Sequence, residues 1–485
     1  MTDSNSNYSD LPQGWKLTKI GEVCTKPQYG YTTKAAQEGN IHLLRTTDIT
    51  SGQINWNTVP FCLENPSYPE KYILKDGDIV ISRAGSIGCS YLIKNPKYSV
   101  FASYLIRFQC KEIIDQKFFK LFLKSPLYWQ SISEKKLGIA VLNINATKLQ
   151  DIDIPLPPLP EQHRIVEKIE ELFSELDNGV ASLKKALEQL KTYRQAVLKW
   201  AFEGKLTEKW RNTHQDSLED GDTLLEQIKA ERKRHYQQQL EDWKQALKEW
   251  ENNGKETKKP TKPQQPKDLP PLTKEELGNL PSLPNGWMWT NFCNVTYKIG
   301  DIDHKMPRDY PNGYPYLSTG NLQQDGIIDF ENAKTISPED FDRLSLKIQP
   351  QRGDIIFPRY GTIGRNFLVN FDKKFLVSYS CAIIKNITKI MNEKFVFYYS
   401  LSPYIKKEIK RYVKETTQAN IGIASIESFV FPLCSELEQT QIVQEIESRL
   451  SVCDQLEATL TENLNKAEAL RQSILKRAFE GKLVL

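Results

Sequence analysis

The 485-residue sequence has little of what usually marks a metal or redox site. It contains five scattered histidines, and no two of its eight cysteines lie closer than about twenty residues. The paired C-x-x-C spacing of zinc sites and dithiol clips is therefore absent, and we predict no metal site. The cysteines are expected to be buried, reduced thiols.

Long apolar runs are also missing. No stretch approaches the roughly 18 apolar residues that a membrane-spanning helix needs. The first ten residues, MTDSNSNYSD, are polar and acidic, and they lack the basic and apolar regions of a signal peptide. We therefore expect a cytoplasmic protein with no membrane association.

Catalytic motifs are absent as well. The sequence contains no GxxxxGK[ST], GxSxG, HExxH or GxGxxG pattern that would indicate a nucleotide site, a hydrolase or a metalloprotease. The string Asn65–Tyr68, NPSY, is similar to the NPP[YF] motif of adenine-N6 methyltransferases, but Pro69 follows it and no glycine-rich cofactor turn precedes it. We interpret it as a turn and predict no catalytic residue.

The main positive feature is an internal duplication. Four segments recur at offsets of 272, 276, 277 and 277, and the last pair is identical at 10 of 13 positions. They are LPQGW (11–15) and LPNGW (283–287), DGDIVISRAGSIG (76–88) and RGDIIFPRYGTIG (352–364), EQHRIV (161–166) and EQTQIV (438–443), and RQAVLKWAFEGKL (194–206) and RQSILKRAFEGKL (471–483). The nearly constant offsets indicate one duplicated unit. The copies differ freely before the second segment, which suggests one task performed on two targets.

Each copy begins with a mixed part and ends in a long helix. Short strand-like runs between Gly, Asn and Pro turns, with a helix near Lys117–Ser133 that Pro126 interrupts, predict a small α+β domain with a curved or barrel-like sheet. The fold class is therefore α+β, with two tandem domains in a pseudo-twofold repeat. The predicted segments are a first domain (1–158), a first helix (159–206), an insert (207–282), a second domain (283–432) and a second helix (433–485).

Both helices carry narrow apolar stripes at spacings of three and four residues. Such stripes are typical of a coiled coil, and a duplicated pair in one chain predicts antiparallel pairing. The alternative is that each helix packs only on its own domain. The predicted stripe residues are Ile165, Ile169, Leu172, Leu176, Leu183, Leu187, Leu190, Ile442, Ile446, Leu456, Leu460, Leu464 and Ile474.

The insert consists of a polar helix-prone stretch and a Pro/Lys-rich linker. Thr223–Glu251 carries Trp243 and Trp250, and the linker that follows reads GKETKKPTKPQQPKDLPPLT. We interpret the helix as a solvated surface, with a docking surface for another subunit as the alternative.

The small net charge of +4 is unevenly distributed. The two mixed domains carry +4 each, whereas the first helix carries 0, the insert −1 and the second helix −3. Two basic domains on a neutral-to-acidic frame favour a polyanionic partner, and nucleic acid fits because Lys and Arg supply most phosphate-binding energy.

Candidate contact residues come from two kinds of position. Arg45, Thr46, Asn321 and Gln323 lie in the divergent zone, where Arg would read guanine and Asn or Gln adenine. Arg83 and Arg359 are shared by both copies beside a glycine turn that either approaches a phosphate or packs inside the domain. The remaining candidates are Ser86, Lys94, Arg107, Tyr360, Thr362 and Arg365.

Four motifs together resemble the specificity subunits of type I restriction-modification systems. They are the LPxGW openings, the GDI…RxGxIG segments, the PLPEQ…RIV helix entry at Pro158–Ile169 and the LK.AFEGKL ends. The resemblance covers nearly the whole chain. The second copy departs from it at Pro432–Glu436, which lacks the PLPEQ prolines.

This resemblance implies two target-recognition domains, each reading half of a bipartite DNA target, and a coiled coil whose length determines the gap. It also implies two DNA adenine methyltransferase subunits and restriction/translocase subunits as partners. S-adenosylmethionine, ATP and Mg would be bound by those partners and not by this chain. Two other hypotheses remain, a fused methyltransferase-recognition enzyme and a coiled-coil scaffold without DNA specificity.

Overall fold

The computed structural model describes residues 11–136, 143–256, 259–323, 326–413 and 419–484. The polar N-terminal decapeptide lies outside the described residues. The chain forms two compact units, one containing residues up to 186 and from 459 onward, the other containing residues 187–458. The long helices α6 (Leu159–Phe202) and α14 (Glu436–Phe479) contribute to both units. The segment boundaries predicted at 158, 206, 282 and 432 stay predictions, because the units divide within these helices.

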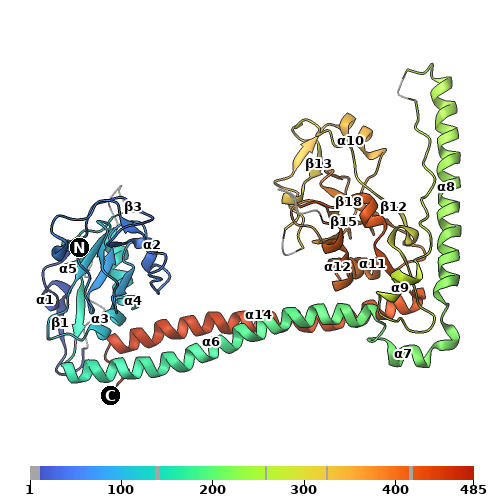
Figure 1. Cartoon of the computed structure of the whole chain (residues 1–485). Helices are drawn as coiled ribbons and strands as arrows, with labels where there is room; N and C mark the ends of the chain where they lie inside the picture. Colours follow the sequence, from blue (N-terminus) through green and yellow to red (C-terminus); the bar gives the residue numbers. More distant parts are fainter. Residues whose placement is uncertain (1–10, 137–142, 257–258, 324–325, 414–418, 485) are drawn as a thin grey trace. The chain divides into compact units, whose positions relative to one another are not determined.

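The described residues of the first unit form three small sheets. Figure 1 shows the domain that contains them. The strands of the three sheets are, in spatial order, β1 (Lys16–Lys19) and β10 (Asp153–Leu156); β2 (Gln28–Tyr29), β9 (Leu105–Phe108), β6 (Ile79–Ser82) and β7 (Ser90–Leu92); and β3 (Ala35–Ala36), β5 (Phe61–Cys62), β4 (His42–Leu44) and β8 (Ser99–Phe101). All pairings are antiparallel except β4 with β8, which is parallel.

Short helices complete this domain. They are α1 (Ile20–Val23), α2 (Thr46–Ile49), α3 (Gln116–Phe122), α4 (Pro126–Lys136) and α5 (Ala146–Gln150). The predicted helix near Lys117–Ser133 is confirmed together with its interruption. Pro126 begins α4, because proline lacks the N–H that a first helical turn leaves unpaired anyway.

The second unit repeats this arrangement. Its strands are β11 (Met288–Asn291) with β19 (Val430–Leu433); β12 (Thr296–Gly300), β18 (Cys381–Asn386), β15 (Ile355–Pro358) and β16 (Phe367–Leu368); and β14 (Lys334–Ile336), β13 (Tyr314–Leu317) and β17 (Leu376–Val377). Its helices include α10 (Pro338–Ser345), α11 (Glu393–Ser400), α12 (Pro403–Tyr412) and α13 (Ile423–Glu427). β13 and β17 are parallel, as β4 and β8 are. The predicted α+β class and its internal repeat are confirmed.

Two duplicated side chains attach the start of each long helix to its domain. In the first unit, Trp15 Nε1 donates to Glu161 Oε1 at 3.0 Å, and the buried Gln162 amide bonds the Asp115 N–H and the Pro157 carbonyl. Loss of such a buried amide would leave several backbone groups unpaired, at about 1–3 kcal/mol each.

The same attachment occurs in the second unit. Trp287 Nε1 donates to Glu438 Oε2 at 2.8 Å, and the Gln439 amide bonds the Asn392 N–H and the Cys434 carbonyl. The Gly-Trp and Glu-Gln pairs found in the sequence thus contact each other. In each copy they attach the start of the long helix to its domain, and we call this contact the docking joint.

Each domain also holds the far end of the other copy's helix. Phe479 of α14 packs against Phe118 and Phe122 in the first unit, with ring centroids 5.0 and 5.4 Å apart. Phe202 of α6 packs against Phe395 and Tyr399 in the second unit, at 5.2 and 4.9 Å. The duplicated AFEGKL ends are therefore anchors that connect the two copies crosswise.

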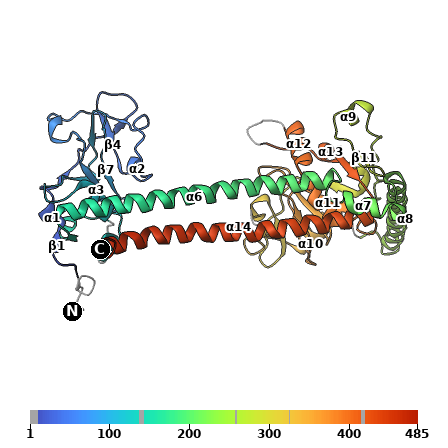
Figure 2. The ribbon, with the colours of Figure 1, turned by 90° about the horizontal axis from the view of Figure 1, so that it is seen from below.

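Within each unit, α6 and α14 run antiparallel (Figure 2). In the second unit Arg194 bonds Asp454 at 2.6 Å and Glu457 at 2.8 Å. In the first unit Arg471 pairs with Asp177. Antiparallel pairing and packing on the domains both occur, so the two predicted alternatives are not exclusive.

The predicted stripe residues fall into three groups. Ile165, Ile169, Ile442, Ile446 and Ile474 are buried in the domain cores, because they lie on the helix ends that dock there. Those between the docked ends are half-buried, namely Leu172, Leu176, Leu183, Leu187, Leu190, Leu460 and Leu464. Leu456 is 49% exposed, and Cys453 occupies the buried position near it.

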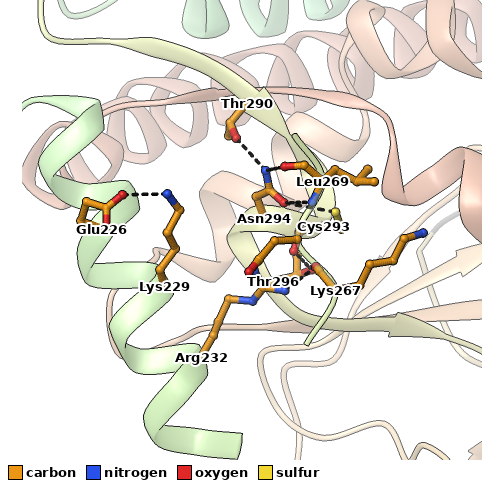
Figure 3. Close-up of polar contacts among 10 residues, drawn as sticks. Glu226, Lys229, Arg232, Lys267, Leu269, Thr290, Cys293, Asn294 and Thr296 are labelled. Atoms are coloured by element: carbon orange, nitrogen blue, oxygen red, sulfur yellow. Dashed lines mark hydrogen bonds and ion pairs between the residues drawn. The ribbon is translucent and has the colours of Figure 1, made fainter. Parts of the chain in front are cut away.

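The insert begins as part of the second unit's core. After α7 (Glu208–Thr213), the helix α8 (Gly221–Asn252) buries Leu224, Leu225 and Ile228. The returning linker is held by Asn294, whose side chain bonds both the N–H and the carbonyl of Leu269, and by Arg232, which donates to the Lys267 carbonyl at 2.8 Å (Figure 3). The helix is therefore not uniformly solvated.

Candidate nucleic-acid interface

The parallel strands β4 and β8 end side by side, and the loop after β4 presents Arg45. Its guanidinium bonds Asp48 through Nε at 3.1 Å and through Nη2 at 2.9 Å, while its backbone N–H donates to the same carboxylate at 2.8 Å. The side chain is 40% exposed. The hydrogen bond with Asp48 raises the pKa of Arg45, so the guanidinium stays charged and is held in one orientation.

Thr46 and the shared glycine turn lie next to Arg45. Ser82, at the end of β6, donates to the Thr46 hydroxyl at 3.3 Å, and the Thr46 methyl lies about 4.0 Å from where a Cβ on Gly85 would stand. Gly85 has a φ of +76°, which favours glycine. The structure thus brings Arg45, Thr46 and the exposed Ser86 to one end of the sheets.

Arg83 belongs to the same end of the domain. Its guanidinium lies 5.0 Å from the centre of the Tyr29 ring, in cation–π contact. Its backbone N–H donates to the carbonyl of Tyr104, whose side chain is 62% exposed. Its buried Nε has no hydrogen-bond partner among the described residues, so the arginine retains donor capacity.

Lys94 and Arg107 lie elsewhere. Lys94 is exposed and contributes with Lys124 to lowering the pKa of Lys120, although burial of Lys120 is the larger cause. Arg107 is 8% exposed, and its guanidinium bonds Asp78 and the carbonyl of Ile73. Arg107 therefore holds the domain together, and we do not carry it into the proposed interface.

In the second copy, the loop after β13 takes the place of the loop after β4. The Asn321 side chain accepts from the Ser318 N–H at 2.9 Å and from its hydroxyl at 3.0 Å, so Asn321 shapes this loop. Its neighbour Gln323 is exposed. No arginine stands where the first copy has Arg45, because Ser318 follows β13.

Arg359 is buried, unlike Arg83. It is 5% exposed, and its Nη2 bonds Asp301 at 2.6 Å and the Tyr379 carbonyl at 2.8 Å. Tyr360 lies beside it, edge-on to the Tyr379 ring at 6.1 Å. In the second copy this turn therefore packs inside the domain and does not present Arg359 to a phosphate. Arg359 is not among the proposed DNA contacts.

Thr362 and Arg365 lie beyond Arg359 in the same turn. Both are partly buried, and both line a cleft against the long helices. They are therefore separate from the loop that carries Asn321 and Gln323.

The sequence patterns missed several aromatic side chains at these loops. Tyr29 and Tyr104 flank Arg83, and His304 stacks on Tyr379 at 4.6 Å between ring centroids. Tyr29 and Tyr104 are far from Arg83 in sequence, and no motif connects them. The only available signal is the position of Tyr104 directly before the strand β9.

Other kinds of site are not found in the described residues. The eight cysteines are free thiols. Within the described ranges, no group of three or more His, Cys, Asp or Glu side chains converges as a metal site would require. In that same part of the chain, none of the helices has the length and apolar character to span a membrane.

The fold and the loops after β4 and β13 together define a class of protein. It is internally duplicated, with one polar loop on each α+β domain and two long antiparallel helices. Solved chains share this fold. The HsdS subunit of Thermoanaerobacter tengcongensis matches with a TM-score of 0.51 and 16% identity, with all of both chains covered. A chain from a study of type I R-M complex assembly and conformational transition gives 0.59 and 16%, covering 98% of this chain and 100% of that one.

The chain belongs to the family described as type I restriction modification DNA specificity domain, whose model matches residues 12–190 and 290–466. Among curated relatives, the type I restriction enzyme EcoKI specificity subunit of Escherichia coli K12 is 25% identical over 98% of this chain and 90% of its own length. The EcoBI specificity subunit of Escherichia coli is 25% identical over 94% and 83%.

Proposed function

We propose that this chain is the DNA specificity subunit of a type I restriction-modification complex and that it recognises a bipartite target. The observation that carries the proposal is the duplication of one loop set with different side chains. Arg45 and Thr46 follow β4 in one copy, and Asn321 and Gln323 follow β13 in the other. The family membership of both copies supports it.

The chemistry of the two loop sets supports unequal half-sites. Asp48 holds Arg45 through Nε and one Nη2 N–H. The Nη1 group and the second Nη2 N–H then form the pair of parallel donors that suits guanine O6 and N7. Asn321 and Gln323 offer amides, which suit adenine. We assign Ser86, and the exposed Lys94 farther along the domain, to the phosphate backbone, which supplies affinity without sequence information.

The proposal assigns no catalysis to this chain. We infer that two DNA adenine methyltransferase subunits and the restriction/translocase subunits assemble on it, and that S-adenosylmethionine, ATP and Mg are bound by those partners. The docking joints at Trp15 and Trp287 make the helix pair a rigid base for such an assembly within each unit. The recognition domains would be residues 1–158 and 283–432.

Methylation mapping tests the proposal directly. The chain is co-expressed with the methyltransferase encoded beside it, and adenine methylation is read along a genome. We expect one bipartite motif with a fixed gap. S-adenosylmethionine binding by the isolated chain would instead support the fused enzyme, and methylation without any sequence preference would support the scaffold.

Replacing Arg45 with alanine should weaken one half-site only. Loss of a bidentate arginine–guanine contact costs about 1–3 kcal/mol, or roughly 5- to 150-fold in affinity. Fluorescence anisotropy of the methyltransferase complex on the mapped site, with each base pair varied in turn, measures this. Specificity should relax at one position of the half-site read by residues 1–158.

Lys94→Ala is the matched control. Lys94 is exposed but lies away from the Arg45 loop, so its loss should weaken binding slightly and equally on all sequences and reduce the salt dependence. If the two substitutions behave alike, Arg45 contacts phosphate and not a base.

A further inference from the structure

A cleft of about 430 Å³ lies between the glycine turn after β15 and the long helices in the second unit. Its apolar lining includes Leu198 of α6 and Leu450 of α14, and its cations are Arg194, Arg365 and Lys406. Pockets of this size hold a large side chain or a small ligand. The residues proposed to read bases, Arg45, Thr46, Asn321 and Gln323, do not line it, whereas Thr362 and Arg365, predicted from the sequence as DNA contacts, do.

The first copy has a tryptophan, 39% exposed, at the position that corresponds to Lys406. Lys406 on α12 corresponds to Trp129 on α4 at the offset of 277. A Cβ placed on Gly88 would stand 3.3 Å from the Trp129 ring, whereas a Cβ on Gly364 meets only Ile409 within 4 Å. The ring that lies against the glycine turn in the first copy is therefore absent from the second.

A second aromatic side chain is replaced as well. In the first unit, the Arg471 guanidinium lies 4.4 Å from the centre of the Phe173 ring. The same offset places Arg194 and Leu450 at these two positions in the second copy. Arg194 thus stands over a site that has lost its ring and can accept another, because guanidinium groups stack on aromatic faces.

The cleft also contains unsatisfied polar groups. The buried hydroxyl of Thr362 has no hydrogen-bond partner in the described part of the chain. Arg365 and Lys406 form no ion pair with any described carboxylate, and Lys406 Nζ donates to Gln195 Oε1 at 2.5 Å. Burial lowers the pKa of Lys406. A carboxylate at this rim would satisfy both cations.

We propose that the cleft is a docking site for an aromatic side chain flanked by carboxylates on the methyltransferase partner, and that only the second copy has it. The ring would lie under Arg194 on Leu198 and Leu450, with a carboxylate at Arg365 and Lys406. The proposal rests on the proposed function and deepens it, because the two methyltransferase positions then become unequal. An inorganic anion alone would pair with the cations but would not cover the apolar side chains of Leu198 and Leu450, so it fits the cleft less well.

The test restores the first copy's residues. Lys406→Trp combined with Leu450→Phe restores the two aromatic rings of the first copy and should close the cleft. Lys407→Trp, at an exposed α12 position that does not line the cleft, is the control. The full chain is titrated with the methyltransferase subunit, and native mass spectrometry gives the two stepwise dissociation constants. We expect the closing variant to weaken one step by about tenfold or more and to leave the other unchanged.

Each outcome is decisive. Equal weakening of both steps, or no change in either while complexes still form, overturns the docking site and leaves the proposed function standing. If the closing variant leaves assembly unchanged but abolishes binding of AMP seen with the unmodified chain, the cleft is a nucleotide site and not a docking site. Failure of the unmodified chain to bind methyltransferase refutes the proposed function, and the docking site with it. Equal melting temperatures of the variants confirm that both are folded.

Discussion

Exchange of residues 11–158 for the corresponding domain of another specificity subunit is expected to change one half of the methylated sequence and leave the other half and the gap unchanged. The reason is that each domain has its own sheets and loop set, and both its attachments to the long helices are duplicated. One is the Trp15–Glu161 joint, and the other is the packing of Phe479 on Phe118 and Phe122. Adenine methylation mapping of the exchanged subunit with the same methyltransferase measures the result.

The donor domain must keep large apolar side chains at the positions of Phe118 and Phe122, because a cavity under Phe479 would cost about 3–5 kcal/mol. The reciprocal exchange of residues 283–432 is the matched control, and it should change only the other half. If both halves change in either exchange, or if neither does, the domains do not read DNA independently.

The architecture could be predicted from the sequence because it depends on repetition and periodicity. The GW, EQ and AFEGKL segments recur at one offset, and the structure shows why they recur together: they form the two attachments of each domain to the helices. Apolar spacing likewise predicted two long helices. It did not distinguish stripe residues that pack in a domain, such as Ile169, from those that are half-buried between the docked ends, such as Leu183, because both need the same spacing.

The exposed side chains of the candidate interface could be predicted from the sequence only where a residue directly follows a strand. Arg45 follows β4 and is exposed, as the divergent zone suggested. Arg359 occupies a repeat position equivalent to Arg83, yet Asp301 draws it inside the domain. That pairing joins residues 58 apart in sequence, and no local pattern reports it. Arg107 is buried for the same reason, since its partner Asp78 lies 29 residues away, directly before β6.

Deletion of seven residues from each long helix is expected to abolish methylation at the original gap while preserving both half-site sequences. Residues 180–186 and 462–468 are opposite each other, because Asp177 pairs with Arg471 in the same antiparallel register. Seven residues shorten each helix by about 10 Å, which is comparable to about three base pairs of DNA at about 34–36 Å per turn. Two helical turns are removed almost completely, so the apolar stripes stay in contact.

A library of sites with gaps shortened or lengthened one base pair at a time, scored for methylation, reads the new optimum. Deleting seven residues from α8 beyond its buried Leu224, Leu225 and Ile228, for example 239–245, is the control, since α8 belongs to the insert and not to the helix pair. The original gap should survive that control. Methylation that persists at the original gap after the paired deletion would show that the helices do not determine the spacing, and that the partner subunits do.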